Sequence, residues 1–387
     1  MKKVTASNLP AILCVANWKS DVGYAWWLME SYWVKISELY ADKYTTLLAY
    51  PEINAVPEAI ENSDIHYFQH TFRTTSFSDI KHNMALIRKY NIKVLYLSDY
   101  GVSAPAYAFY RLAGVEKIIV HDHTPGLRTK ASGVKKLLKK GKANLPFMRA
   151  DAAFGATEFV TSRLINTSCF SSSRCYTIQN GIVPFEVAAE HEQDTPAFFP
   201  ADDKRVIVTA ARANKYKGIE FALKVMAELV DQRGRRDVSY MLFGDGPDLE
   251  EFKALAEQLS ISAYCYFPGR VDNAKNWFSR CYLGFQPSRG EVGYSLSILE
   301  YMYARLPVLV PDNPSVSEAT SNGKNGAVYE EDDVQSAVNA IENYLNNPDV
   351  QKTHGEAAHK MVQRQYTLSS THMAFSQAVQ KVIGKVV

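Results

Sequence analysis

The stretch from residue 284 to residue 312, GFQPSRGEVGYSLSILEYMYARLPVLVPD, constrains the fold of this chain more than any other. An apolar segment at 282–286, which ends before Pro287, predicts a strand, and a loop rich in serine, arginine and glycine follows it. At 295–303 the apolar residues recur at the three- and four-residue spacing of a helix with one buried side. A second buried strand is predicted at 306–310. Together these elements form a βαβ unit whose loop leads to a helix N-terminus, where unpaired backbone N–H groups favour an anion.

Two glutamates flank the start of the predicted helix. Glu291 lies in the loop, and Glu300 lies about a turn and a half inside the helix, with its side chain leaning back toward the N-terminus. An acidic residue beside a phosphate-binding helix start commonly accepts hydrogen bonds from sugar hydroxyls. Glu291 is equally compatible with a solvated loop charge. Glu300 is less so, because its neighbours Leu299 and Met302 make an exposed helix face less natural.

The alternation of strands and helices runs through the whole chain and predicts an α/β fold with parallel sheets. Strands are predicted at residues 11–17, 44–50, 65–68, 92–98, 117–120, 150–157, 175–178, 206–210, 239–243 and 306–310. Helices lie between them, and three more, around 333–346, 350–364 and 370–383, finish the chain. In such folds the active face lies at the carboxyl ends of the strands.

Length and composition narrow the class of protein. The 387 residues favour two domains, and residues 184–204, with three prolines and acidic charges, are predicted to link them. With 47% hydrophobic residues and no apolar run as long as a membrane span, the chain is predicted to be soluble and globular. Its start, Met1-Lys2-Lys3, lacks the pattern of a signal peptide. A formal net charge of +2 argues against nucleic acid as a main partner. The five cysteines lack metal-ligand spacing and are expected to be reduced, mostly buried thiols of a cytoplasmic protein.

The predicted strand at 117–120 leads directly into the polar motif HDHTPG at residues 121–126. This position makes His121 and His123 candidates for a functional site. A metal pair is one alternative, but no third ligand has the required spacing, so no metal is expected. A structural role in the loop is as compatible with either histidine as a functional one.

Residues 132–142, SGVKKLLKKGK, predict a basic amphipathic helix. One face consists of Val134, Leu137 and Leu138. The other face carries four lysines: Lys135, Lys136, Lys139 and Lys140. Such a helix is either an ordinary solvated surface helix or one that rests on an anionic membrane surface.

The stretch around Glu291 and Glu300 resembles the signature of retaining GT-B glycosyltransferases of the group 1 type (glycosyltransferase family 4), in which two glutamates flank a glycine-containing loop. The family has seven residues between the glutamates, whereas this chain has eight, and the extra residue falls near 292–294. Further similarities are Asn-Gly-Ile at 180–182, ARANKYKG at 211–218, GDGP at 244–247 and FPGRV at 267–271. The resemblance is good over most of 200–330 and loose in the first half.

The resemblance implies the GT-B fold, with two facing Rossmann-like domains that contain parallel sheets. These would be an N-terminal acceptor domain at 1–183, the linker at 184–204 and a nucleotide-sugar donor domain at 205–365, with a C-terminal helix at 366–387 that crosses back to the first domain. The implied reaction moves a sugar from a UDP- or GDP-sugar to a glycan or lipid-linked acceptor with retention of configuration, in cell-surface polysaccharide synthesis. It implies no cofactor, and a cytoplasmic protein peripheral on the inner face of the cell membrane.

The resemblance also implies roles for single residues. Arg212 and Lys217 would hold the donor diphosphate, which suits two cations at a strand's carboxyl end because the departing nucleoside diphosphate develops negative charge. Glu300 would hold the ribose hydroxyls. The implied catalytic residues are Glu291, on the donor sugar, and His121 or His123, on the sugar or its leaving phosphate. The other implied donor-binding residues are Gly23, Gly244, Arg270, Val271, Tyr294 and Ser295.

Two other kinds of function stay open. One is another enzyme of the same fold, a nucleotide-sugar epimerase or a sugar phosphorylase. The other is a non-catalytic paralogue that binds nucleotide-sugar or scaffolds a partner. The altered glutamate spacing favours the paralogue, as does the single Gly23 in a loop where the family often has paired glycines.

Overall fold

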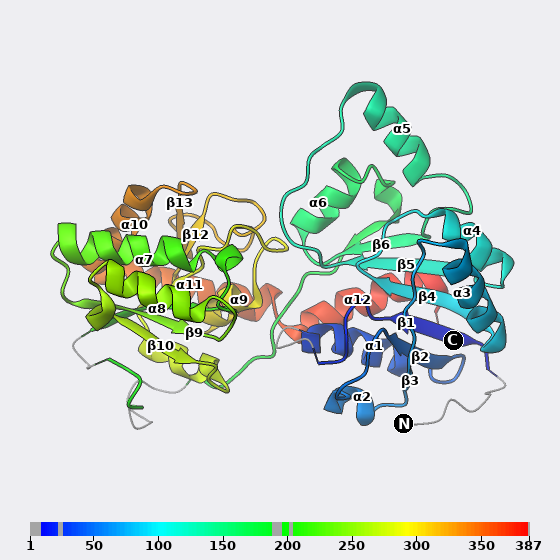
Figure 1. Ribbon diagram of the computed structural model, residues 1–387, viewed down its shortest axis with the longest axis horizontal. Coiled ribbons are helices and arrows are strands. Elements are labelled where there is room, and N and C mark those ends of the chain that lie inside the picture. Colours follow the sequence, from blue (N-terminus) through cyan, green and yellow to red (C-terminus); the bar gives the residue numbers. More distant parts are fainter. Residues whose placement is uncertain (1–8, 22–25, 188–195, 201–203, 386–387) are drawn as a thin grey trace. The chain divides into compact units, whose positions relative to one another are not determined.

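The computed structural model describes residues 9–21, 26–187, 196–200 and 204–385. The chain divides into two compact units. The first unit comprises Met1–Thr124, Arg128–Asn180 and Ser369–Val387, and the second comprises Pro125–Leu127 and Gly181–Leu368. Each unit is built on one all-parallel sheet with helices around it (Figure 1). No helix in these described parts is both long enough and apolar enough to cross a membrane.

The sheet of the first unit has the strand order β3-β2-β1-β4-β5-β6-β7. Its strands are β1 (Ala11–Val15), β2 (Thr45–Tyr50), β3 (His66–Gln69), β4 (Ile92–Ser98), β5 (Lys117–Asp122), β6 (Ala152–Gly155) and β7 (Cys175–Thr177). The strands β1, β4 and β5 are buried over nearly their whole length, as expected for parallel strands covered on both faces. The order reverses between β1 and β4, and sheets of this kind bind ligands outside the carboxyl ends of the strands at such a reversal.

The helices of the first unit connect or cover these strands. They are α1 (Trp27–Tyr40), α2 (Glu58–Glu61), α3 (Phe77–Lys89), α4 (Pro105–Leu112), α5 (Gly133–Ala143), α6 (Glu158–Asn166) and α12 (Leu368–Ile383). The last of them, α12, packs on α1, because the rings of Phe375 and Tyr32 lie 4.8 Å apart and His372 Nε2 lies 3.0 Å from Ser31 Oγ. In α5 every residue except Ala143 is exposed, and Figure 1 shows this helix standing away from the sheet of its unit.

The sheet of the second unit has the strand order β10-β9-β8-β11-β12-β13 and reverses between β8 and β11. Its strands are β8 (Arg205–Ala210), β9 (Val238–Phe243), β10 (Cys265–Gly269), β11 (Leu283–Phe285), β12 (Val308–Pro311) and β13 (Gly326–Tyr329). Its helices are α7 (Ile219–Ala227), α8 (Leu249–Gln258), α9 (Leu296–Tyr303), α10 (Val334–Asn346) and α11 (Pro348–Gln365).

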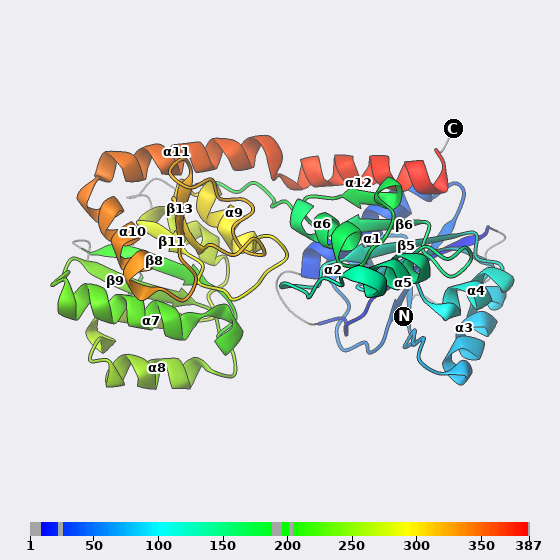
Figure 2. The ribbon, with the colours of Figure 1, turned by 90° about the horizontal axis from the view of Figure 1, so that it is seen from above.

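Two apolar cores lie on opposite faces of the second sheet, because successive side chains of a strand point to opposite sides. Val206 and Val208 belong to the core that includes α9 and α11. Ile207, between them, belongs to the core that includes α7, α8 and α10. Figure 2 shows α11 on one side of this sheet and α7 and α8 on the other.

The predicted α/β fold with two parallel-sheet, Rossmann-like units is confirmed. The predicted strands and helices all occur, with ends that shift by a few residues. The strand predicted at 150–157 is shorter, at Ala152–Gly155, because Thr157 already caps the next helix by accepting the N–H of Val160. All five cysteines are free, and four of them are buried.

Candidate functional site

In the second unit, the predicted site residues follow the two strands at which the strand order reverses. The strand β8 ends at Ala210 and leads into the loop that carries Arg212 and Lys217, and β11 ends at Phe285 and leads into the loop that carries Glu291. The carboxyl ends of neighbouring parallel strands meet at one edge of a sheet, so the two loops are neighbours. Their contact is direct, because Lys217 Nζ lies 2.5 Å from Glu291 Oε1.

The Lys217–Glu291 ion pair is mostly enclosed by protein, with side chains only 22% and 11% exposed. Gln286 Nε2 also donates to Glu291 Oε1, at 3.3 Å. Glu291 is therefore not a solvated loop charge. Removing one member of such a pair leaves the other charge buried without compensation, so the two side chains must be considered together.

The backbone of the Glu291 loop is held by hydrogen bonds to the segment around Ser315 and Glu318. The N–H groups of Glu291 and Gly293 both donate to the carbonyl of Ser315, at 3.2 and 2.8 Å, and Glu318 N donates to the carbonyl of Gly293 at 3.0 Å. Gly293 has a φ of +114°, a conformation that side chains with a Cβ rarely adopt. The loop between the two glutamates thus has a fixed course that depends on its glycine.

The helix α9 begins at this loop and carries Glu300. Ser295 is its N-cap, and its Oγ accepts the N–H of Ile298 at 3.4 Å. Glu300 is buried, so it is not a surface helix charge. The N-terminus of α9, which favours an anion, and the buried carboxylate of Glu300, which can accept hydrogen bonds from hydroxyl groups, therefore lie in the same helix.

The same helix is fixed to the end of β8 through Ala210. Ser297 Oγ donates to the carbonyl of Ala210 at 2.7 Å, and the Tyr301 hydroxyl accepts the N–H of the same residue. Gly284 on β11 leaves room for the Tyr301 ring, which a Cβ at that position would overlap. The position of α9 is thereby coupled to the start of the loop that carries Arg212 and Lys217.

The two predicted cations differ in their surroundings. Lys217 is engaged by Glu291, whereas Arg212 is exposed and its side chain makes no hydrogen bond or ion pair within the described residues. Lys215, in the same loop, is bound to Glu251 at 2.8 Å. Of the cationic side chains in this loop, Arg212 can therefore bind an anion without breaking an existing ion pair.

The glycines of the GDGP turn serve the packing of the backbone. A Cβ on Gly244, whose φ is +146°, would overlap the carbonyl of Ala211, and one on Gly246 would overlap the carbonyl of Ala213. These two alanines flank Arg212. In this structure Gly244 lets the turn approach the Arg212 loop.

The remaining predicted donor-binding residues differ in their exposure. Arg270 is exposed and lies 3.9 Å from the carboxylate of Asp272, and Val271 beside it is half-buried. The ring of Tyr294 is buried in the core against Tyr366, so only its backbone can meet a ligand. Gly23 lies outside the described residues.

In the first unit, the two predicted histidines have different positions at the end of β5. His121 is fully buried within the strand, and its Nδ1 lies 2.5 Å from the hydroxyl of Tyr96. His123 follows the strand and is partly exposed, with its ring centroid 4.1 Å from that of His121. Burial lowers the pKa of His121 well below the usual value and that of His123 to about 4, so both rings are neutral at pH 7.

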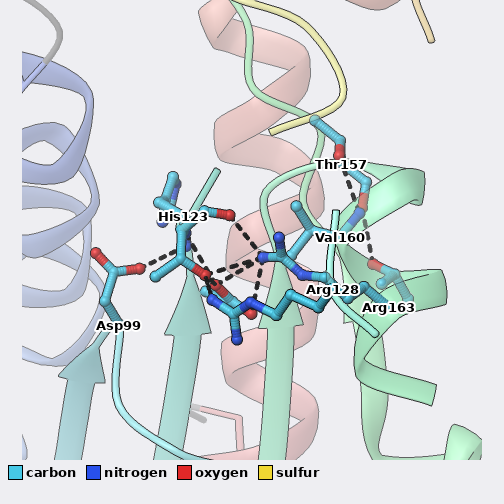
Figure 3. Close-up of polar contacts among 9 residues, drawn as sticks. Asp99, His123, Arg128, Thr157, Val160 and Arg163 are labelled. Carbon is cyan, nitrogen blue, oxygen red and sulfur yellow. Dashed lines mark hydrogen bonds and ion pairs between the residues drawn. The ribbon is translucent and has the colours of Figure 1, made fainter. Parts of the chain in front are cut away.

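The backbone around His123 is fixed by charged side chains (Figure 3). Asp99 accepts the N–H of His123 at 2.6 Å. Arg163 Nη2 donates to the carboxylate of Asp122 at 3.1 Å and to the carbonyl of Thr124 at 2.6 Å, and Arg128 donates to the Thr124 hydroxyl. The HDHT turn is therefore held on both sides of His123.

Asp99 is a candidate site residue that the sequence analysis did not name. It follows β4 directly, has a φ of +61°, and burial raises the pKa of its carboxyl group to about 7. An aspartate immediately after the buried segment 92–98 was a usable signal in the sequence, because that segment ends where the active face was expected.

Two other predictions concern charge and metal. Lys135, Lys136, Lys139 and Lys140 all lie exposed on α5. In the part of the chain that the structure describes, no three histidine, cysteine, aspartate or glutamate side chains gather as a metal site would require.

Comparison with known sequences finds similarity over the second half of the chain. Residues 191–361 match the family described as "Glycosyl transferases group 1". The chain is 28% identical over 181 residues to the lipopolysaccharide core biosynthesis mannosyltransferase LpcC of Rhizobium leguminosarum bv. viciae, a match that covers 45% of this chain and 50% of that protein. It is 27% identical over 178 residues to the alpha-D-kanosaminyltransferase of Streptomyces kanamyceticus, covering 44% of each. The chain thus spans about half the length of these curated relatives.

Solved structures show the same fold over nearly the whole chain. A glycosyltransferase from Rickettsia africae ESF-5 matches with a TM-score of 0.76 at 14% identity, covering 97% of this chain and 99% of that one. Anabaena Alr3699/HepE, solved in complex with UDP, matches with a TM-score of 0.69 at 15% identity, covering 96% of this chain and 100% of that one. The chain therefore has the GT-B fold, and its residues 191–361 are similar to the group 1 glycosyltransferases.

Proposed function

We propose that this protein transfers a sugar from a nucleotide-sugar, a UDP- or GDP-sugar, to a glycan or lipid-linked acceptor with retention at the anomeric carbon. The observation that carries the proposal is the arrangement where the second sheet reverses. There a lysine and a glutamate from two loops form a pair, next to a capped helix start that is tied to the end of β8. The curated relatives support a place in cell-surface polysaccharide synthesis, since one of them is named for lipopolysaccharide core biosynthesis.

The second unit would bind the donor through its charged and backbone groups. Arg212 and the N-terminus of α9 would bind the diphosphate, and Lys217 would share its charge between Glu291 and the terminal phosphate. The attraction between these positive groups and the leaving diphosphate grows as negative charge accumulates on it. The site can therefore stabilise the transition state more than the bound donor. No cofactor is required for this chemistry.

The carboxylates would bind the sugar moieties of the donor. Glu300, buried in α9, would accept the ribose hydroxyls, while Glu291 would orient the transferred sugar. Arg270 and Val271 would read the base through main-chain groups. Each assignment follows the family resemblance residue by residue and is supported by the burial of both glutamates.

His123 is the histidine that we assign to the donor sugar. His121 is enclosed in the core and bound by Tyr96, and therefore acts as a support for its neighbour. A neutral His123 ring can accept or donate one hydrogen bond without adding a charge. Its fixed backbone makes that interaction geometrically specific.

The test is incubation of the full chain with a panel of radiolabelled UDP- and GDP-sugars, with and without lipid extract. Transfer of label to lipid or glycan, with a product whose anomeric configuration by NMR equals that of the donor, is the expected result. Inversion would refute retention. A rearranged nucleotide-sugar without acceptor would indicate an epimerase, sugar phosphate formed with inorganic phosphate would indicate a phosphorylase, and binding without turnover would indicate a non-catalytic paralogue.

We further propose that α5 holds the protein on an anionic membrane surface, on the cytoplasmic side. Val134, Leu137 and Leu138 are 71%, 69% and 69% exposed, so the apolar face of this helix is not buried against the protein. The lysines on the remaining surface complement anionic lipid head groups. An exposed apolar stripe with flanking lysines on one short helix matches an interfacial helix better than an ordinary surface helix.

A further inference from the structure

A cavity of about 250 Å³ lies at the carboxyl edge of the first sheet. It straddles the position between β1 and β4 at which the strand order reverses. Its walls come from the segments that follow four strands, including Asn17 after β1, Pro51 after β2, Thr71, Arg73 and Thr74 after β3, and Tyr100 after β4. The cavity therefore occupies the position in the first unit at which a parallel sheet of this kind binds a ligand.

The wall that follows β3 is fixed by buried side chains. Asn83, on α3, is buried and donates to the carbonyl of Arg73 at 2.7 Å and to the hydroxyl of Tyr110 at 2.8 Å. The hydroxyl of Tyr100 donates to the carbonyl of Phe72 at 2.8 Å. The backbone of this segment is thus placed before any ligand arrives, which lowers the entropic cost of binding.

The side chains on this wall remain available. Within the described residues, the side chains of Asn17, Thr71, Arg73 and Thr74 make no hydrogen bond or ion pair. The carboxylate that follows this wall, Asp79, is engaged by its own helix cap, where the Ser76 hydroxyl donates to it at 2.7 Å. Among the described residues, Arg73 is the one charged residue in the cavity lining. Hydrogen bonds from Ser76 and Thr75, together with the nearby charge of Arg73, lower the pKa of Asp79, which does not itself line the cavity.

We propose that this cavity binds the acceptor and that the acceptor is a hydroxyl-rich molecule with an anionic group, a phosphate or a carboxylate, held by Arg73. Arginine presents its N–H donors as a planar fork that fits the two oxygens of either anion. Asn17, Thr71 and Thr74 supply the short polar groups that carbohydrate hydroxyls need. The identification of this ligand as the acceptor rests on the proposed glycosyl transfer; the preference for an anion rests on the cavity alone.

The binding test uses three probes on the full chain, glucose 6-phosphate, glucuronate and glucose, with affinities measured by ligand-detected NMR. The wild type should bind at least one anionic probe roughly tenfold more tightly than glucose, the usual effect of one charged hydrogen bond. Arg73→Gln should abolish that preference, while Arg88→Gln, which removes an exposed arginine from the last turn of α3, away from the cavity, should keep it. Thr74→Val should weaken all three probes and keep the preference.

The outcomes separate this inference from the proposed function. Equal affinity for glucose and both anions, or an unchanged preference in Arg73→Gln, would overturn the inference. A preference for glucose 6-phosphate over glucuronate would identify a phosphate acceptor, and the reverse a carboxylate. Binding of UDP and GDP to the same variants should be unchanged. If neither nucleotide binds while the anionic sugars bind through Arg73, the donor assignment fails and the anion site stands.

Discussion

At the scale of single residues, the pairing of Lys217 with Glu291 changes how both must be tested. The sequence identified each of them, but it gave them separate partners, the diphosphate and the sugar. It could not show that they meet, because 74 positions separate them and only the neighbouring ends of β8 and β11 bring their loops together. Arg212 has no such partner in the described residues. Its predicted role, binding the donor diphosphate, therefore stays a proposal.

Lys217→Ala should lower turnover by more than it weakens donor binding, by roughly 10²–10³, if it removes one group that stabilises the leaving phosphate. Lys217→Arg should recover part of the activity, since it keeps the charge and changes the geometry. Steady-state kinetics at saturating donor measure both. Lys215→Ala, in which the lost lysine pairs at the surface with Glu251, is the matched control and should resemble the wild type. Wild-type turnover in Lys217→Ala would refute the assignment.

Glu300→Ala should weaken the binding of the nucleoside diphosphate by roughly 1–3 kcal/mol, because the ribose hydroxyls would lose a buried acceptor. Calorimetric titration with UDP and GDP measures this. Glu291→Ala should reduce turnover and sugar selectivity more than nucleotide affinity. Glu257→Ala, on the exposed side of α8, is the control. Equal affinities in Glu300→Ala and the wild type would show that Glu300 does not hold the ribose.

At the scale of secondary-structure elements, the two helices on which the sequence analysis relied most have opposite environments. Both were predicted from the spacing of apolar residues. In α9 those residues enter the core, whereas in α5 they face outward. Periodicity predicts that a helix has an apolar side, but it does not show what covers that side. The exposed apolar face of α5 could be learned only from the structure.

A Leu137→Ser/Leu138→Ser variant should lose most of its flotation with anionic liposomes, because the apolar side chains would no longer enter the head-group region. The change of Lys135, Lys136, Lys139 and Lys140 to glutamine should weaken flotation at low salt, since each lysine contributes on the order of 1 kcal/mol near a charged leaflet. Leu112→Ser, which alters an equally exposed leucine on α4, is the control and should float like the wild type. If the wild type does not float with anionic liposomes at low salt, the membrane proposal for α5 is wrong.

At the scale of the whole molecule, the sequence predicted two units with parallel sheets, whereas the order of the strands came from the structure. It did not predict the network around His123, because Asp99 and Arg163 come from segments 64 residues apart whose side chains have no common sequence pattern. Nor could it locate the cavity near Arg73, whose walls come from four separate strand ends. Helices, strands and motifs that lie within one segment could be predicted from the sequence. Contacts and cavities formed by several distant segments could not.

The helix α12 contributes to the core of the first unit, and this leads to a prediction about stability. Phe375 on α12 is fully buried, and its ring packs on Tyr32 at 4.8 Å, Tyr96 at 6.0 Å and Phe154 at 6.1 Å. Phe375→Ala should therefore lower the free energy of unfolding of the first unit by about 3–5 kcal/mol. Met373→Ala, which truncates a 61% exposed side chain on the same helix, should change it by less than about 0.5 kcal/mol.

Tryptophan fluorescence during urea unfolding can follow the first unit selectively, because four of the five tryptophans, Trp18, Trp26, Trp27 and Trp33, belong to it and only Trp277 belongs to the second. Phe375→Ala should shift this transition to lower urea. The variant should still bind the nucleoside diphosphate with wild-type affinity under native conditions, because the residues assigned to the nucleotide, unlike His123, belong to the second unit with its own two cores. Equal midpoints for Phe375→Ala and Met373→Ala would show that α12 is dispensable for the first unit. A loss of nucleotide affinity in Phe375→Ala would show instead that the second unit depends on the first for its fold.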